Sequence, residues 1–177
     1  MTFFFFASIS FTTPLFFASI YCIYSLCPFG FTISGLYGID LLIDILKSGK
    51  KIGIANKECI ISLGKNLNNL AKKFVTEIIP LDSEHNSIYQ LIKQTDKKFE
   101  SITLTASGGP FINYKLKDLK TVTLKETIKH PIWNMGKKIS IDSANMMNKA
   151  LEIIEAKYLF NLNDNQIKTV IHPQAII

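Results

Sequence analysis

The chain has 177 residues, which is enough for one domain with a buried core and too few for two full-sized domains. Its formal net charge of +6 comes from 20 basic residues, all of them lysine, against 14 acidic residues. These lysines are spread among acids from Lys47 to Lys168 rather than clustered with aromatic side chains, which argues against a nucleic-acid-binding protein. Cys22, Cys27 and Cys59 have neither CxxC nor zinc-ligand spacing, which indicates reduced thiols.

Residues 1–34 differ sharply from the rest of the chain. They hold nine of the thirteen phenylalanines, and the first charged side chain of the protein is Asp40. The segment is long enough to span a bilayer, but it contains Pro14 and Pro28 and lacks the flanking basic residues of a membrane helix. Two interpretations stay open: a membrane or targeting segment, and a non-native stretch or remnant of a larger domain. Membrane contact is the less favoured of the two.

The remaining residues alternate between strand-like and helix-like patterns, as α/β proteins do. Short apolar runs predict strands, and apolar residues three and four positions apart predict helices. The predicted strands are residues 51–55, 77–81, 101–105 and 168–171. The predicted helices are residues 40–48, 60–74, a segment from about residue 87, and residues 143–160.

Two acidic residues follow the second predicted strand. Asp82 and Glu84 flank Ser83, so both carboxylates can point the same way from an extended turn. Ligands collect at the carboxyl ends of strands in an open α/β sheet, and hard cations such as Mg²⁺ or Mn²⁺ prefer carboxylate oxygens. Glu152, on the last predicted helix, is the candidate third ligand. The alternatives are an ordinary surface pair of acids and a solvated helix face with a Lys149–Glu152 pair.

A glycine-containing loop follows the third predicted strand. In Ser107-Gly108-Gly109 the backbone N–H groups can approach an anion closely, and Ser107 adds a hydroxyl. Ser143, Asn148 and Lys149 supply further donors near the start of the last predicted helix, where the helix dipole favours phosphate. Together these residues favour a phosphorylated substrate, and an ordinary turn remains the alternative for the glycine loop.

Residues 130–136 have the composition of a flap over a ligand. They combine the titratable ring of His130, the large flat side chain of Trp133 and the terminal Gly136. The alternative is that Trp133 and Met135 belong to the hydrophobic core.

Seven short motifs occur in a fixed order along the chain. They are A-N-K-E at 55–58, L-D-S-E-H-N at 81–86, L-T-A-S-G-G-P-F at 104–111, H-P-x-W-x-M-G at 130–136, K-I-S-I-D-S-A at 138–144, M-M-N-K-x-L-E at 146–152 and I-H-P-Q at 171–174. In these motifs and their spacing the chain resembles 1-deoxy-D-xylulose 5-phosphate reductoisomerase. The resemblance runs from near Gly35 to Ile177, and this stretch is less than half of a full family member.

The resemblance implies an enzyme of the non-mevalonate isoprenoid pathway. Such an enzyme converts 1-deoxy-D-xylulose 5-phosphate to 2-C-methyl-D-erythritol 4-phosphate with NADPH and Mg²⁺, Mn²⁺ or Co²⁺. It also implies a homodimer that works on a small phosphosugar, in the bacterial cytoplasm or, alternatively, in a plastid-type organelle.

The resemblance also implies a role for each matched site residue. The implied metal ligands are Asp82, Glu84 and Glu152, and the implied catalytic residues are Lys57, Glu84 and His130. The residues expected to bind substrate are Ser83, Ser107, Trp133, Ser143, Asn148 and Lys149. Ser83, together with the implied catalytic residue Lys57, is expected to face the sugar hydroxyls. The residues expected to lie toward the nicotinamide cofactor are Asn56, Lys57, Glu58, Met135 and Gly136.

The sequence also departs from the family pattern. A glycine-rich fingerprint for the NADPH pyrophosphate is not found, and the Phe-rich segment stands where it is expected. Ala175 and Cys59 occupy positions where the family commonly has serine. We therefore expect a fragment or a split or decaying gene, and a chain that does not oxidise NADPH alone. The alternative function is a non-catalytic remnant that still binds metal or phosphate.

The expected fold is α/β, with the end of a Rossmann-like NADPH-binding domain followed by an α/β catalytic domain, both incomplete. Its expected parts are residues 1–34, the Phe-rich segment; residues 35–75, the remnant of the NADPH-binding domain; and residues 76–177, the catalytic domain with the metal and phosphosugar site.

Overall fold

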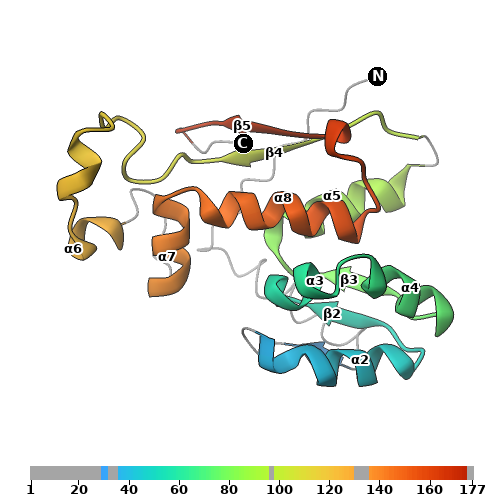
Figure 1. Ribbon diagram of the computed structural model, residues 1–177. Helices are drawn as coiled ribbons and strands as arrows, with labels where there is room; N and C mark the ends of the chain where they lie inside the picture. Colours follow the sequence, from blue (N-terminus) through green and yellow to red (C-terminus); the bar gives the residue numbers. More distant parts are fainter. Residues whose placement is uncertain (1–28, 32–35, 96–97, 130–135, 175–177) are drawn as a thin grey trace, which may run out of the picture.

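The computed structural model describes residues 29–31, 36–95, 98–129 and 136–174. These residues form a mixed α/β structure with two separate parallel sheets (Figure 1). Within the described ranges, no helix combines the length and the apolar character needed to cross a bilayer. Most of the Phe-rich segment lies outside these ranges, as do residues 130–135 of the expected flap.

The first sheet is built from two consecutive strand–helix–strand units. Its strands β1 (Phe29–Phe31), β2 (Ile52–Ile54) and β3 (Ile78–Pro80) lie in that order and are all parallel. Helix α2 (Ile39–Lys47), which follows the short 3₁₀ helix η1 (Leu36–Gly38), connects β1 to β2. Helices α3 (Lys57–Leu63) and α4 (Lys65–Lys73) connect β2 to β3. The side chains of the shared core are Leu42, Leu46, Ile52, Ile54, Cys59, Ile60, Leu67 and Ala71.

Residues 60–74 form two helices and not the single helix that their apolar spacing predicts. The chain breaks at Gly64, whose φ of +53° is a conformation that residues with a side chain rarely adopt. A Cβ atom at this position would lie 3.3 Å from the ring of Tyr158, so α3 and α4 pass close to the long C-terminal helix. The first of the two helices begins at Lys57 because the Asn56 side chain accepts a hydrogen bond from the backbone N–H of Cys59.

The second sheet is a parallel pair, β4 (Ile102–Ala106) and β5 (Ile167–Ile171). Alternate residues of β4 are buried, as period-two strand geometry requires of a half-buried strand. Ile102 and Leu104 pack with Ala156 of α8 (Met147–Leu159) and with Leu162. The strands predicted from the sequence are thus confirmed to within one or two residues.

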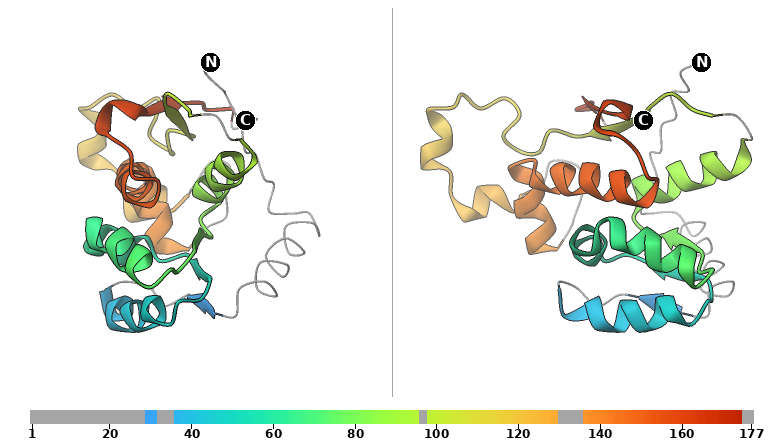
Figure 2. Two further views of the ribbon diagram at one scale, coloured as in Figure 1. Left: turned by 90° about the vertical axis from the view of Figure 1, so that its right-hand side faces the viewer. Right: turned by 45° about the vertical axis from the view of Figure 1, so that its right-hand side comes forward.

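Helix α8 lies between the two sheets and contacts both halves of the molecule (Figures 1 and 2). It packs against α3 and α4 on one side and against β5 on the other. The sequence predicts one helix over residues 143–160, but the structure has α7 (Lys137–Ala144) followed by α8. Met146 separates them because its φ of +63° is left-handed.

Three short helices lie outside these layers. They are η2 (Asp118–Thr121), α6 (Leu124–Thr127) and η3 (Asp164–Gln166). The segment that carries α6 extends away from both sheets and returns to α7 (Figure 1). A reciprocal pair of hydrogen bonds between Thr123 and Glu126 caps α6.

Glu77, just before β3, forms hydrogen bonds and ion pairs with side chains of α5 (Ser83–Gln94) and with Lys51, just before β2. Its carboxylate accepts hydrogen bonds from Lys93 Nζ at 2.5 Å and Tyr89 OH at 2.6 Å, and Lys51 Nζ lies at 3.0 Å. The hydrogen bond from Lys93, followed by those from Tyr89 and Lys51, lowers the pKa of Glu77 to about 2. Tyr89 and Lys93 lie on α5, so this network anchors α5 to the sheet.

Candidate functional site

The acidic run after β3 forms the beginning of α5. The sequence predicts a helix from about residue 87, but α5 starts at Ser83, and Asp82 occupies its N-cap position. Asp82, Ser83, Glu84 and His85 therefore lie within the first helical turn, where the positive end of the helix dipole favours carboxylates. This turn faces α8, which contributes further acidic side chains.

Asp82, Glu84 and Glu152 come together at this junction. One carboxylate oxygen from each of them lies within 4.8 Å of the others. The side chain of Glu152 is 2% exposed and that of Asp82 is 14% exposed, whereas that of Glu84 is 33% exposed. The cluster is thus buried at one end and reachable from solvent at Glu84.

Two lysines contact the three carboxylates. Lys57 Nζ, at the start of α3, lies 3.0 Å from Asp82 Oδ2 and 3.6 Å from Glu152 Oε1. Lys149 Nζ lies 3.3 Å from Glu84 Oε1 and also forms an ion pair with Glu152 Oε2. Burial alone would lower the pKa of each lysine, but the neighbouring carboxylates outweigh it and raise both pKa values. Both side chains therefore carry a positive charge at neutral pH.

Asn148 completes the contacts around Lys57. Its amide oxygen accepts a hydrogen bond from Lys57 Nζ at 3.1 Å, and its amide nitrogen donates to Glu152 Oε1. Burial, followed by the charge of Glu84, raises the pKa of Glu152. Burial would also raise the pKa of Asp82, but a hydrogen bond to His85 and the charge of Lys57 hold it well below its usual range.

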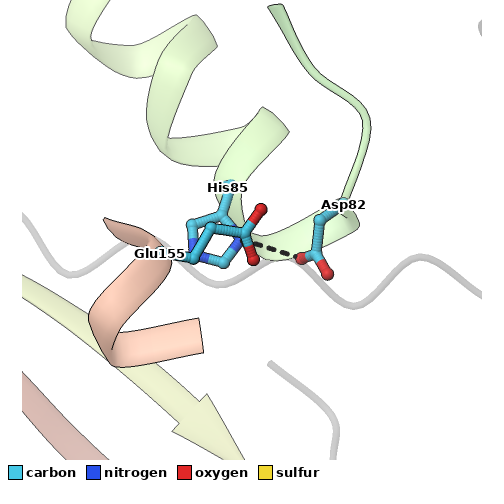
Figure 3. Close-up of side chains that lie close together, drawn as sticks. All are labelled: Asp82, His85 and Glu155. Atoms are coloured by element: carbon cyan, nitrogen blue, oxygen red, sulfur yellow. Dashed lines mark hydrogen bonds and ion pairs between the residues drawn. The ribbon is translucent and has the colours of Figure 1, made fainter. Parts of the chain in front are cut away.

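His85 and Glu155 form a second buried group beside Asp82 (Figure 3). Both side chains have no exposed surface. Nδ1 of His85 lies 3.0 Å from Asp82 Oδ1 and 3.5 Å from Glu155 Oε2, and its Nε2 lies 2.9 Å from the backbone carbonyl of Glu152. Burial opposes the imidazolium, but Asp82 and Glu155 raise the pKa of His85 to about 9. Burial raises the pKa of Glu155 to about 7.

The donors in the first cluster fit a hard divalent cation. Asp82, Glu84 and Glu152 offer only carboxylate oxygens, which Mg²⁺ and Mn²⁺ prefer. Oε2 of Glu152 is buried and forms an ion pair with the Lys149 ammonium, so a cation bound by Glu152 would share this carboxylate with Lys149.

The glycine loop after β4 lies against the end of α7. Gly108 and Gly109 have φ values of +88° and +72°, and a Cβ atom on Gly109 would lie 2.7 Å from the carbonyl oxygen of Ser143. The fold thus brings the Ser107–Gly109 loop next to Ser143, as the predicted anion site requires. Asn148 and Lys149, which we expected in the same site, point their side chains into the carboxylate cluster.

The residues expected near a nicotinamide cofactor are only partly described. Asn56 is buried as the cap of α3, and Glu58 forms an ion pair at 3.0 Å with Lys138 of α7. Gly136 is exposed at the start of α7. His130, Trp133 and Met135 lie outside the described residues.

No role for His85 or Glu155 was predicted from the sequence. A usable signal was present, because Asp82 and His85 are three residues apart, as are Glu152 and Glu155, and residues at this spacing share one helix face. The signal was missed because the predicted helix started after His85.

Comparisons with known proteins show which family the chain resembles in sequence. Residues 78–160 match the family model of the 1-deoxy-D-xylulose 5-phosphate reductoisomerase C-terminal domain. The 1-deoxy-D-xylulose 5-phosphate reductoisomerase of Wolbachia pipientis subsp. Culex pipiens (strain wPip) is 52% identical over 146 residues, covering 82% of this chain and 37% of the relative. That of Phocaeicola vulgatus is 47% identical over 143 residues, covering 81% of this chain and 37% of the relative.

Solved structures give the same result. A DOX-P reductoisomerase in complex with NADPH, fosmidomycin and magnesium superposes with a TM-score of 0.74 and 42% identity, over 81% of this chain and 38% of that chain. The Zymomonas mobilis enzyme in complex with NADPH has a TM-score of 0.74 and 36% identity, over 84% of this chain and 38% of that chain. The chain thus spans well under half the length of the relatives it matches. In sequence and in its mixed α/β fold, the chain belongs to the 1-deoxy-D-xylulose 5-phosphate reductoisomerase family.

Proposed function

We propose that this chain carries the divalent-cation and phosphosugar-binding part of a 1-deoxy-D-xylulose 5-phosphate reductoisomerase. The observation that carries the proposal is the convergence of Asp82, Glu84 and Glu152 within 4.8 Å, in a chain about half identical to enzymes of that name. The reaction would convert 1-deoxy-D-xylulose 5-phosphate to 2-C-methyl-D-erythritol 4-phosphate with NADPH. The DOX-P reductoisomerase solved with NADPH and magnesium supports the choice of these cofactors.

Each part of the cluster has a distinct task in this proposal. The three carboxylates hold Mg²⁺ or Mn²⁺, which supplies Lewis acidity toward adjacent substrate oxygens. Ser83, at the first turn of α5, and Lys57 donate hydrogen bonds to the sugar hydroxyls. Lys149, which is buried beside Glu84, holds a positive charge at the same place. These fixed donors orient the substrate before it reacts.

The phosphate end of the substrate belongs at the glycine loop. Ser107 and Ser143 supply hydroxyl groups there, and Gly108 and Gly109 allow the backbone to approach an anion. The contact between Gly109 and Ser143 supports this assignment, because it brings two donor sets to one place. Residues 130–136, with His130 and Trp133, would close over the substrate and exclude water.

The division of the chain follows from the same proposal. Residues 35–75 would be the end of a Rossmann-like NADPH-binding domain. They contain β2, the central strand of the first parallel sheet, whereas β1 precedes this range and β3 follows it in the chain. Residues 76–177 would be the catalytic domain. Asn56, Lys57, Glu58, Met135 and Gly136 would lie toward the nicotinamide. We further propose a homodimer in a bacterial cytoplasm, by analogy with the family.

The experiment that tests this function measures substrate binding with and without the cation. Isothermal titration calorimetry of the purified chain should show one Mn²⁺ site, and 1-deoxy-D-xylulose 5-phosphate should bind more tightly once Mn²⁺ is present. The variant Glu152→Gln should lose both effects, because it removes an anionic ligand from a hard-cation site. A parallel assay follows NADPH oxidation, since turnover separates an enzyme from a remnant that only binds.

The matched control is Glu126→Gln, which removes the same charge from an exposed position on α6. It should bind Mn²⁺ and substrate like the wild type. The proposal is wrong if the wild type binds the substrate equally well with and without Mn²⁺, or if the two variants behave alike.

A further inference from the structure

One imidazole connects the two helices that carry all three candidate cation ligands. His85 lies on α5, next to Asp82 and Glu84, and it reaches across to α8. One ring nitrogen contacts the Asp82 carboxylate at 3.0 Å, and the other contacts the backbone carbonyl of Glu152 at 2.9 Å. His85 thus touches the side chain of one ligand residue and the main chain of another.

The hydrogen-bond partners of His85 determine where its protons lie. A backbone carbonyl can only accept, so Nε2 carries a hydrogen and donates it to the carbonyl of Glu152. Nδ1 faces two carboxylates, Asp82 at 3.0 Å and Glu155 at 3.5 Å, which are also acceptors when ionised. Nδ1 is therefore directed at the side chain of one ligand residue, and Nε2 at the main chain of another.

Burial argues against a second metal site in the same place. Asp82, His85 and Glu155 have the ligand types and the closeness of a metal site, with one atom of each within 4.8 Å of the others. However, the side chains of His85 and Glu155 have no exposed surface, whereas Mg²⁺ usually keeps several water ligands.

The geometry instead gives His85 an orienting task. Oδ1 of Asp82 contacts His85, which leaves Oδ2 to contact Lys57 Nζ. The same Lys57 Nζ lies near Oε1 of Glu152. Rotation of the Asp82 carboxylate would break the contact with His85. Glu155, three residues after Glu152 on α8, lies 3.5 Å from the same nitrogen of His85. Contacts of this kind to a ligand commonly control metal affinity.

Resting on the function proposed above, we propose that His85, with Glu155 beside its ring at 3.5 Å, is the positioning residue of the cation site. It fixes the rotation of the Asp82 carboxylate and the distance between α5 and α8, and it does not bind the cation itself.

The test separates the two hydrogen bonds of His85 by substitution. An asparagine amide nitrogen lies near the place of Nδ1, so His85→Asn keeps a donor to Asp82. A glutamine amide nitrogen lies near the place of Nε2, so His85→Gln keeps a donor to the Glu152 carbonyl. His85→Leu keeps neither, and Glu155→Gln keeps the volume but removes the charge beside the ring.

Mn²⁺ affinity is measured by calorimetry, and thermal unfolding is measured on the same samples. We expect His85→Leu to bind Mn²⁺ roughly 10- to 100-fold more weakly, as loss of a residue that orients a metal ligand typically does. His85→Asn should recover more of the affinity than His85→Gln, because it retains the contact with the ligand side chain. Glu155→Gln should bind more weakly than the wild type. The matched control, His172→Gln, changes a histidine beyond the end of β5 and should leave affinity unchanged.

Two results would overturn the inference about His85 and leave the proposed function intact. One is wild-type Mn²⁺ affinity in folded His85→Leu. The other is an equal loss in His85→Asn and His85→Gln that follows their unfolding temperatures, since a purely structural histidine predicts that result. If the wild type itself does not bind Mn²⁺, the proposed function fails, and the inference fails with it.

Discussion

Lys57→Met should tighten binding of a divalent cation, although it removes a residue from the site. Lys57 Nζ lies 3.0 Å from Asp82 Oδ2 and 3.6 Å from Glu152 Oε1, two oxygens that we assign to the cation. A Mg²⁺ ion about 2.1 Å from those oxygens would lie roughly 5 Å from an ammonium that did not move. Lys57 and the cation therefore compete for the same two carboxylates.

The size of the competition can be estimated from these distances. Repulsion between a divalent cation and an ammonium at about 5 Å is roughly 6–7 kcal/mol with an effective dielectric constant near 20. The lysine avoids this repulsion by rotating away, which costs the hydrogen bond to Asp82, about 1.5–3 kcal/mol for a charged partner. Because losing this hydrogen bond costs less than the repulsion, the lysine rotates away, and the free energy of cation binding is reduced by the cost of the hydrogen bond. Removing Lys57 should thus strengthen cation binding by about 10- to 100-fold.

Calorimetric titration with Mn²⁺ at neutral pH measures this change directly. The matched control is Lys51→Met, which removes a charge that pairs with Glu77 outside the cluster. It should bind Mn²⁺ like the wild type. Circular dichroism verifies that both variants are folded. Equal or weaker Mn²⁺ binding by folded Lys57→Met would show that the ammonium does not compete, and would refute the reasoning.

Three further predictions concern other polar side chains. Glu152→Gln should weaken Mn²⁺ binding at least about tenfold in calorimetry, because an anionic ligand is lost; Glu126→Gln is its control. Ser107→Ala and Ser143→Ala should each weaken the inhibition that inorganic phosphate exerts on binding of a substrate analogue, because each removes a hydroxyl donor from the proposed phosphate site; unchanged inhibition in both variants would contradict the assigned pocket. Glu77→Gln should destabilise the fold by about 1 kcal/mol at neutral pH. Because the pKa of Glu77 is lowered from 4.5 to about 2, this contribution is present above pH 4.5 and is lost as pH falls toward 2, and thermal unfolding against pH measures it.

The sequence was sufficient to predict β2, β3, β4 and β5, because their apolar runs are short and end at polar residues. It did not predict β1, which lies in the uncharged Phe-rich segment and pairs with β2. It also identified Asp82, Glu84 and Glu152 as residues that would meet. The predicted helix boundaries were wrong at positions where a positive φ interrupts a segment whose residue pattern predicts one continuous helix. Gly64 and Met146 adopt positive φ values in the middle of segments with helical periodicity.

The contacts of the site could not be predicted for a different reason. Lys57 and Asn148 are hydrogen-bonded across 91 residues of sequence, and His85 reaches the carbonyl of Glu152 across 67. No local pattern encodes pairs so far apart, because they result from the packing of α3 and α5 against α8. The role of His85 depends on such a contact and could emerge only from the fold.

Stability alone does not account for the charges buried at this junction. Glu152, Glu155 and His85 are almost completely inaccessible, and transferring such groups from water is costly even when they are paired. Apolar side chains of similar volume commonly replace buried ion pairs with no loss of stability. The Leu and Ile side chains of the neighbouring cores show that this fold fills its interior with apolar residues elsewhere. Four carboxylates, two ammonium groups and one imidazole are concentrated at the starts of α3 and α5 and along α8. The ligand-binding role proposed above gives a physical reason for this concentration, which stability does not.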